Sequence, residues 1–183
     1  MFLQQLHHVK AFVFDVDGVL TDGTVLVTES GEQLRQFSIK DGYALQLAVK
    51  RGYFITIISG GRSNGVALRL RGLGIHDIHL GAESKIEIYK NFVASNNLQP
   101  EEIIYMGDDI PDLPVMKLVG LPVCPSDAAE EIKSISKYIS PISGGKGCVR
   151  DIIEKVLKIQ HKWYDETPSA HDGSIIIDET LTR

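Results

Sequence analysis

Residues 9–23 read VKAFVFDVDGVLTDG. The stretch begins with an apolar run, which ends in the acidic residues Asp15 and Asp17 and in Gly18. The run is rich in β-branched and aromatic residues, so it predicts a buried strand. Asp15, Asp17 and Gly18 then fall in the loop that follows this strand. Because fully apolar strands of this length are typical of sheets covered on both faces, the segment indicates an α/β fold.

The rest of the chain alternates short apolar strands with stretches of helical spacing. Two alternating stretches, 24–28 and 33–39, are separated by Ser30 and Gly31 and predict a hairpin. The alternation indicates a Rossmann-like, doubly wound, mostly parallel sheet, from which the β-hairpin protrudes. The predicted strands cover residues 9–16, 53–58, 77–80, 102–106, 121–124 and 137–139, and the predicted helices cover 43–51, 63–71, 84–95, 112–118, 127–134 and 149–161.

The composition is that of one compact domain. The chain has 183 residues, 43% of them hydrophobic, and a net charge of −5. The acidic balance disfavours a nucleic-acid or anionic-membrane surface, and no apolar run approaches the roughly 18 residues of a membrane span. Two cysteines are too few for a disulfide framework. We expect a cytoplasmic protein with one domain over residues 1–162 and a polar tail over residues 163–183.

Polar clusters follow several of the predicted strands, at the sheet edge where ligands bind in doubly wound folds. Their carboxylates have no cysteine or histidine neighbours, which favours Mg²⁺ over zinc. Ser59 and the backbone amides of Gly60 and Gly61 suit phosphate oxygens, and Lys85 supplies a positive charge. The combination predicts phosphoryl transfer. The carboxylates concerned are Asp15, Asp17, Asp108 and Asp109.

The order of these motifs resembles that of the haloacid dehalogenase superfamily of phosphatases. The chain shows DVDGVLTDG at 15–23, an apolar strand that ends at Ser59, a lysine at Lys85, and GDDIPD at 107–112. The dehalogenases proper lack the second aspartate of the first motif, so Asp17 indicates phosphate chemistry. The resemblance covers about residues 9–160 and implies a magnesium-dependent phosphatase.

The resemblance also implies a role for each motif residue. Asp15 would be the nucleophile that forms an aspartyl-phosphate, and Asp17 would serve as general acid and base. Ser59 would bind the phosphoryl group and Lys85 would neutralise it. The metal would be held by Asp15, the Asp17 carbonyl and Asp108, with Asp109 on a metal-bound water and Asp112 further out.

Further segments resemble one family within that superfamily, the 3-deoxy-D-manno-octulosonate 8-phosphate phosphatases. They are TDG at 21–23, KDG at 40–42, GRS at 61–63 and GGKGCVRD at 144–151. That family has no cap domain, and neither gap between the motifs here has room for one. The resemblance implies a homotetramer in which the hairpin packs against neighbouring subunits and closes each site. The tail runs longer than the family pattern leads us to expect.

A substrate with a carboxylate and a phosphate would need further polar contacts. Arg62 is suited to a carboxylate or a phosphate through its planar fork. Lys146 and Arg150 would add cationic contacts, Asp22 and Lys40 would reach sugar hydroxyls, and Gly60 would lie beside the phosphate. Each of these charged residues could instead be an ordinary exposed side chain on the surface. The same holds for Lys85, because Lys90 is a second candidate for the lysine of the motif. Asp109 could instead be a helix N-cap.

Three other functions stay open at this point. The same mechanism could act on a nine-carbon sialic or deaminated sugar-acid 9-phosphate, since the sequence does not reveal the pocket size. A phosphorylatable signalling receiver also has an acidic cluster, a hydroxyl and a lysine at strand ends, but its accepting aspartate lies on a middle strand. A silent homologue kept for assembly is the third, and the intact motifs argue against it.

Overall fold

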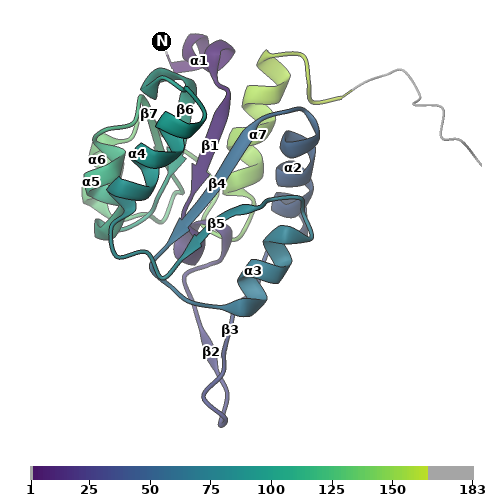
Figure 1. Ribbon diagram of the computed structural model, residues 1–183, viewed down its shortest axis with the longest axis vertical. Helices are drawn as coiled ribbons and strands as arrows, with labels where there is room; N and C mark the ends of the chain where they lie inside the picture. The colour runs from purple at the N-terminus through teal and green to yellow at the C-terminus, as the bar shows by residue number, and fades with distance from the viewer. Residues whose placement is uncertain (1, 165–183) are drawn as a thin grey trace, which may run out of the picture.

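A computed structural model describes residues 2–164 and contains a six-stranded sheet whose neighbouring strands all run parallel (Figure 1). Its strands are β1 Ala11–Phe14, β4 Phe54–Ser59, β5 Asp77–Leu80, β6 Ile103–Met106, β7 Leu121–Cys124 and β8 Tyr138–Ile139. The strand order is β5-β4-β1-β6-β7-β8. The chain therefore builds the sheet outward on one side of β1 and then returns to build the other side. Such a reversal opens a crevice at the carboxyl ends of the strands.

Helices cover both faces of the sheet. In Figure 1, α2, α3 and α7 lie on one side of it, and α4, α5 and α6 lie on the other. A short α1 precedes β1 at the amino end of the sheet. The helices are α1 Phe2–Gln5, α2 Ile39–Lys50, α3 Asn64–Arg71, α4 Lys85–Ser95, α5 Leu113–Met116, α6 Glu130–Ile135 and α7 Cys148–Ile159. None of the helices in residues 2–164 has the length and apolar composition that a membrane crossing requires.

Strand β1 contributes to the hydrophobic core on each face, as its uninterrupted apolar sequence predicts. Phe12 and Phe14 belong to the core beneath α2 and α7, whereas Ala11 and Val13 belong to the core beneath α4 and α5. All four residues are buried. Successive side chains of a strand point to opposite faces, so only a strand covered on both sides has this pattern. The rigid centre of the sheet thus carries the first aspartate motif at its end.

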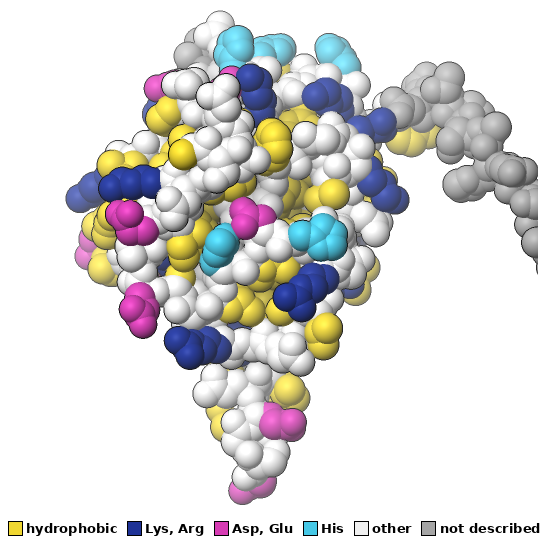
Figure 2. All heavy atoms as spheres, viewed as in Figure 1, with side chains coloured by type: hydrophobic (Ala, Val, Ile, Leu, Met, Phe, Trp, Pro, Cys, Tyr) yellow, Lys and Arg dark blue, Asp and Glu magenta, His cyan; other side chains and the backbone are white. Residues whose placement is uncertain are grey.

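The hairpin is formed by β2 Leu26–Val27 and β3 Gln33–Leu34, which pair antiparallel. It projects from the body as a narrow extension (Figure 2). Leu26 and Val27 are 68% and 62% exposed, so its apolar side chains contact little of their own chain. The described residues between β1 and α4 contain only the hairpin, α2, β4, α3 and β5, and no cap domain. The predicted fold class, with its hairpin and without a cap, is confirmed.

Several element boundaries differ from the prediction for local reasons. Helix α2 begins four residues early, because the Ser38 hydroxyl accepts from Asp41 N and caps it. Helix α6 begins three residues late, because Ala129 N donates to the carbonyl of Asp108 and holds the preceding loop. Strand β1 ends at Phe14, two residues before its predicted end at Val16. Residues 16–20 form one broken helical turn closed by a bond from Thr21 N to Val16 O. The short α1 was not predicted.

The predicted tail begins at Trp163, and only its first two residues are described. The Trp163 ring packs edge-on against Tyr43 with a centroid separation of 6.1 Å, and the Arg150 guanidinium lies 5.1 Å from its centroid. Trp163 therefore packs on the folded body formed by α2 and α7. Residues 165–183 of the predicted tail lie outside the described residues, and the domain boundary stays a prediction.

Candidate active site

The carboxyl ends of β1, β4 and β6 and the start of α4 meet at one cleft of about 480 Å³. This edge is where the sheet reverses its order, as predicted for ligand binding. Most of the residues predicted for catalysis and metal binding therefore come together, although they are up to about a hundred positions apart in sequence. The predicted residues that line the cleft are Asp15, Asp17, Ser59, Gly60, Lys85, Asp108 and Asp109, joined by Asp112.

Lys85 lies in the centre of the cleft and is almost completely buried. Its Nζ lies 3.0 Å from Asp15 Oδ2 and 2.7 Å from Asp112 Oδ1. Burial favours the neutral amine, but the charges of Asp15 and Asp112 outweigh it, and the net effect raises the pKa of Lys85. The lysine is therefore a charged group fixed beside the predicted nucleophile. The alternative candidate, Lys90, is 60% exposed in its side chain and pairs only with Glu87.

Asp112 is buried and accepts hydrogen bonds from several groups of the site, including Lys85. The resemblance led us to expect it further from the metal than Asp108. Asp112 Oδ1 also accepts a hydrogen bond of 2.7 Å from the Tyr105 hydroxyl, and its Oδ2 accepts one of 3.2 Å from Asp108 N. Asp112 thus fixes both the ammonium and the loop that carries Asp108. Tyr105 escaped the sequence analysis because it looks like one more apolar residue of a buried strand. The spacing of Asp108 and Asp112 within one short turn was the available signal for Asp112.

Three carboxylates of the cleft crowd together. Oxygens of Asp15, Asp108 and Asp112 lie within 4.8 Å of one another. Burial, followed by repulsion from Asp112, raises the pKa of Asp15 to about 7. Burial, followed by repulsion from Asp15 and Asp112, raises the pKa of Asp108 to about 7. With only Lys85 to balance three carboxylates, the described residues of the cluster carry two excess negative charges when ionised.

This cluster fits a divalent cation of the Mg²⁺ type. The donors are all carboxylate oxygens, which Mg²⁺ prefers, and one dication would balance the two excess charges. The repulsion that Lys85 leaves uncompensated is otherwise relieved by protonation. The geometry of the described residues therefore agrees with the metal inferred from the sequence. It brings together Asp15, Asp108 and Asp112.

Gly18 makes the close approach of Asp108 possible. A Cβ atom at Gly18 would lie 2.0 Å from Asp108 Oδ2, and the residue has φ of +87°. Only glycine adopts this backbone conformation without strain. The carboxylate of Asp108 therefore lies directly over the turn that follows β1, close to Asp15.

Asp17 faces a cation that the sequence analysis did not single out. Arg35, which follows β3 of the hairpin, donates from Nε to Asp17 Oδ1 at 2.7 Å and from Nη2 to Asp17 Oδ2 at 3.1 Å. This two-point hydrogen bond raises the pKa of Arg35. Asp17 and Arg35 are 18 positions apart, and only the folding back of the hairpin brings them together.

Ser59 ends β4 and is buried at the floor of the cleft. Its hydroxyl accepts from Gly61 N at 3.2 Å, so this amide is occupied within the loop while the hydroxyl proton is free to be donated. Gly60 and Gly61 line the cleft beside it. The cleft is thus lined by one hydroxyl donor in addition to Lys85, in keeping with the predicted phosphate contacts.

Asp109 lines the outer part of the same cleft and is exposed. Its Oδ1 accepts from Ile110 N at 2.8 Å, which is an N-cap of the short turn that follows. It lies outside the three-carboxylate cluster. The predicted contact through a metal-bound water stays a prediction.

The structure does not bring the remaining predicted substrate residues into this cleft. Arg62 is exposed and lines a second cleft of about 840 Å³ between the hairpin and the start of α3. Lys40, Lys146 and Arg150 line a separate groove beside α7. Asp22 pairs with Lys146 at 3.4 Å and accepts from the Thr24 hydroxyl. Their assignment to substrate binding stays a prediction.

The KDG and GGKGCVRD segments hold the frame of the site. Asp41 Oδ1 accepts from Arg150 N at 2.7 Å, so α2 provides the cap for α7. Gly145 N donates to Val19 O at 2.9 Å, which ties the glycine-rich loop to the turn after β1. The first contact joins α7 to α2, and the second joins the loop before α7 to the turn that contains Asp17.

Comparisons with known proteins agree on one family. Residues 71–150 match the haloacid dehalogenase-like hydrolases. A 3-deoxy-D-manno-octulosonate 8-phosphate phosphatase of Yersinia pestis is 34% identical over 160 residues, which cover 87% of this chain and 86% of the relative. The crystal structure of that phosphatase from Yersinia pestis matches with a TM-score of 0.86 and 33% identity, covering 88% of each chain.

A second solved structure is informative about ligands. The phosphatase of the same name from Moraxella catarrhalis, in complex with magnesium, phosphate and a KDO molecule, matches with a TM-score of 0.85 and 31% identity. The match covers 88% of this chain and 93% of that chain. The resemblance read from the motifs is confirmed.

Proposed function

Because the chain belongs to the 3-deoxy-D-manno-octulosonate 8-phosphate phosphatase family of haloacid dehalogenase-like hydrolases, we propose that it removes the phosphate from this sugar acid with Mg²⁺ as cofactor. The observation that carries the proposal is the cleft in which Lys85 and the clustered Asp15, Asp108 and Asp112 meet. Carboxylates this close to an anionic substrate need cationic partners. The cleft contains one cation, Lys85, and a cluster of carboxylates suited to a second, Mg²⁺.

In the first step, an Asp15 oxygen attacks the phosphorus and the bond between phosphorus and the sugar oxygen breaks. Asp17, two residues further on, enters this step protonated and with its contact to Arg35 opened, and donates that proton to the departing oxygen, so the products are the free sugar acid and a phosphoryl group on Asp15. Ser59 donates a hydrogen bond to a phosphoryl oxygen. Lys85, already charged and fixed at 3.0 Å from Asp15, stabilises the negative charge on these oxygens.

In the second step, water attacks the phosphorus of the aspartyl-phosphate. Asp17 accepts a proton from this water, and the bond between the phosphorus and Asp15 breaks. Inorganic phosphate leaves, and both aspartates return to their starting states. One hard displacement is thus divided into two easier ones by the same pair of carboxylates.

Mg²⁺, when bound by Asp15, Asp108 and the Asp17 carbonyl, lowers the repulsion between Asp15 and the phosphate oxygens. Asp112 positions the loop of Asp108 and the Lys85 ammonium around it. Asp109 would hold a water of the bound metal, as the resemblance implies.

We also propose a homotetramer and a cytoplasmic location. Support for the assembly comes from the projecting hairpin, whose leucine and valine side chains are largely uncovered within one chain. A neighbouring subunit over this hairpin would shield a cleft that has no cap domain of its own. Light scattering tests this, since a fully active monomer would contradict it.

The test of the reaction is phosphate release from 3-deoxy-D-manno-octulosonate 8-phosphate in Mg²⁺ by the wild type and by Asp15→Asn. The variant keeps the shape of the side chain and loses the nucleophile, so turnover should disappear. Asp77→Asn, at the amino end of β5 and remote from the cleft, is the matched control and should retain activity. Normal turnover by Asp15→Asn would overturn the mechanism, and a higher kcat/KM on a nine-carbon 9-phosphate would overturn the substrate.

A further inference from the structure

The contact between Arg35 and Asp17 occupies both oxygens of the predicted acid–base residue. The two hydrogen bonds of 2.7 and 3.1 Å form a planar fork against the carboxylate. The Arg35 side chain is only 7% exposed, whereas Asp17 is 33% exposed. The hairpin therefore delivers a well-buried guanidinium to the one catalytic carboxylate that opens toward solvent.

The loop after β4 is shaped to admit this pair. A Cβ atom at Gly61 would lie 2.9 Å from Asp17 Oδ2 and 3.3 Å from Arg35 Nη2. A glycine at this position thus leaves room for the two side chains to meet beside Ser59. The Arg35 Nη1 atom also donates to the carbonyl of Gln33 at 3.4 Å, which orients the guanidinium from the hairpin side.

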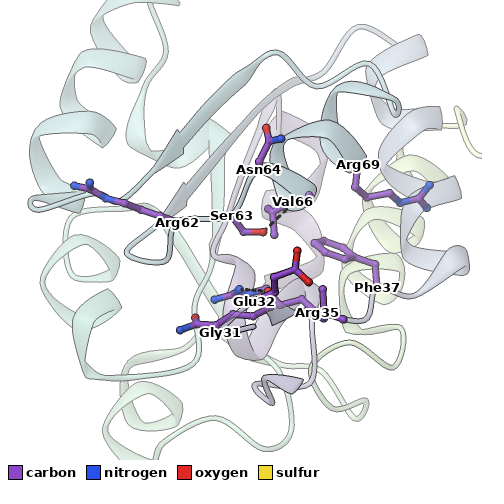
Figure 3. A pocket seen from close by; sticks show the side chains of 12 residues that line it. Gly31, Glu32, Arg35, Phe37, Arg62, Ser63, Asn64, Val66 and Arg69 are labelled. Atoms are coloured by element: carbon purple, nitrogen blue, oxygen red, sulfur yellow. Dashed lines mark hydrogen bonds between the residues drawn. The ribbon is translucent and has the colours of Figure 1, made fainter. Parts of the chain in front are cut away.

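Arg35 also lines the neighbouring cleft, so it lies on the boundary between two cavities. Asp17 and Gly61 belong to the catalytic cleft, while Arg35 belongs to the cleft of about 840 Å³ between the hairpin and α3. Figure 3 shows this second cleft with hairpin residues on one side and Ser63, Asn64 and Val66 of the α3 start on the other. In the same view Arg62 and Arg69 extend in opposite directions away from each other.

Each Asp17 oxygen keeps a second lone pair that can accept from a water, but a proton that Asp17 donates to the leaving oxygen must sit on an oxygen that now accepts from Arg35. Proton donation to the leaving oxygen therefore requires Asp17 to turn that oxygen away from Arg35. That movement opens the fork and leaves a buried guanidinium with fewer partners, which is costly unless another anion replaces Asp17. A carboxylate and a phosphate both match the fork. Because Ser59 and Lys85 in the catalytic cleft are proposed to hold the phosphate, the carboxylate of the substrate is the anion left to replace Asp17.

We propose that Arg35 is a positioning residue that grips Asp17 in the resting site and exchanges it for the carboxylate of the bound sugar acid. Recognition of the substrate carboxylate then releases Asp17 for catalysis. This inference rests on the proposed function, since it requires a substrate that carries both a carboxylate and a phosphate. A phosphate ester without a carboxylate would have to break the fork without compensation.

The test compares two substrates across Arg35 variants. One is 3-deoxy-D-manno-octulosonate 8-phosphate, and the other is a pentose 5-phosphate, which has an alkyl leaving group but no carboxylate. In Arg35→Gln the fork cannot form, so kcat/KM for the sugar-acid phosphate should fall about 10- to 100-fold. For the pentose phosphate, kcat should stay equal to that of the wild type or rise. Arg35→Lys keeps the charge but loses the fork, so its kcat/KM for the sugar-acid phosphate should lie between the values of the wild type and of Arg35→Gln.

The control is Arg71→Gln, the same substitution at an exposed arginine at the end of α3, which should leave both substrates unchanged. Equal losses of kcat on both substrates in Arg35→Gln would mean that Arg35 only orients Asp17, and would overturn the exchange. If the wild type does not hydrolyse the sugar-acid phosphate, the proposed function fails. The measurement with the pentose 5-phosphate still tests the inference in that case. A lower kcat on this substrate in Arg35→Gln would contradict the proposal that Arg35 restrains Asp17.

A second measurement uses the wild-type protein and does not depend on the folding of a variant. The Nε–H resonance of Arg35 should shift when 3-deoxy-D-manno-octulosonate is added with Mg²⁺ and inorganic phosphate. Phosphate and Mg²⁺ alone should leave it unchanged, because the catalytic cleft would bind the phosphate without reaching the guanidinium. An equal shift with phosphate alone, or no shift with the sugar acid, would overturn the exchange.

Discussion

Replacing Lys85 by methionine removes the central cation of the site while keeping a side chain of similar length. The ammonium lies 2.7 and 3.0 Å from two carboxylates, and its side chain is 8% exposed. Breaking a buried ion pair on one side costs roughly 3–5 kcal/mol, because the remaining charge is left without compensation. For a chain of this length that corresponds to a fall of about 6–20 °C in the unfolding midpoint.

The measurement is urea and thermal unfolding in EDTA and in Mg²⁺, together with phosphate release. Mg²⁺ should restore part of the lost stability, since it supplies positive charge to the same carboxylates. Turnover should still fall roughly 10²- to 10³-fold, because the phosphoryl oxygens lose their fixed cation. Lys90→Met is the matched control: it lies one and a half turns along the same helix, is 60% exposed, and should cost less than about 1 kcal/mol. Equal small losses in both variants would refute the buried-cation argument.

Two further predictions concern the metal site. Gly18→Ala should abolish Mg²⁺-dependent turnover and reduce the stabilisation by Mg²⁺, because its Cβ would lie 2.0 Å from Asp108 Oδ2 at a φ of +87°. Gly31→Ala is the control for backbone strain, since Gly31 also has a positive φ but has open space around it. Equal activity losses in the two variants would contradict the role of Asp108. Burial and mutual repulsion raise the pKa values of Asp15 and Asp108 from 3.8 to about 7. Without metal, the folded state therefore binds more protons than the unfolded state between pH 4 and 7. Its free energy of unfolding falls as the pH rises through that window. Mg²⁺ competes with these protons, so it should raise the unfolding midpoint more at pH 8 than at pH 5.5, and an equal shift at both values would contradict this assignment.

The sheet and most of its helices could be predicted because each depends on local pattern. Strand β1 is an unbroken apolar run, and β5 and β7 match their predicted residues. The start of α2 was missed because Ile39 is exposed and Gly42 breaks the helical pattern. Asp41, between them, is buried because it caps α7, a contact with a residue more than a hundred positions away. Such a contact leaves no local signal.

The same division holds for the site. Asp15, Ser59, Lys85 and Asp108 were predictable because parallel strands end at one edge and the motifs follow these ends. Arg35 was not, since it reaches Asp17 only through the path of the hairpin. The buried role of Asp112 depends likewise on tertiary contacts with Tyr105 and Lys85.

The two aspartates of the first motif meet different cations, and the difference suits what each must do. Asp15 faces the compact ammonium of Lys85, whose three donors can turn from a carboxylate to a phosphoryl oxygen without moving the nitrogen. Asp17 faces the rigid fork of Arg35, which holds a carboxylate or a phosphate in the same two-point geometry. Because Lys85 and Ser59 already serve the phosphate in the catalytic cleft, the fork of Arg35 is left for the second anionic group of the substrate, its carboxylate. The resting contacts of the two aspartates then outline the two anionic ends of one substrate.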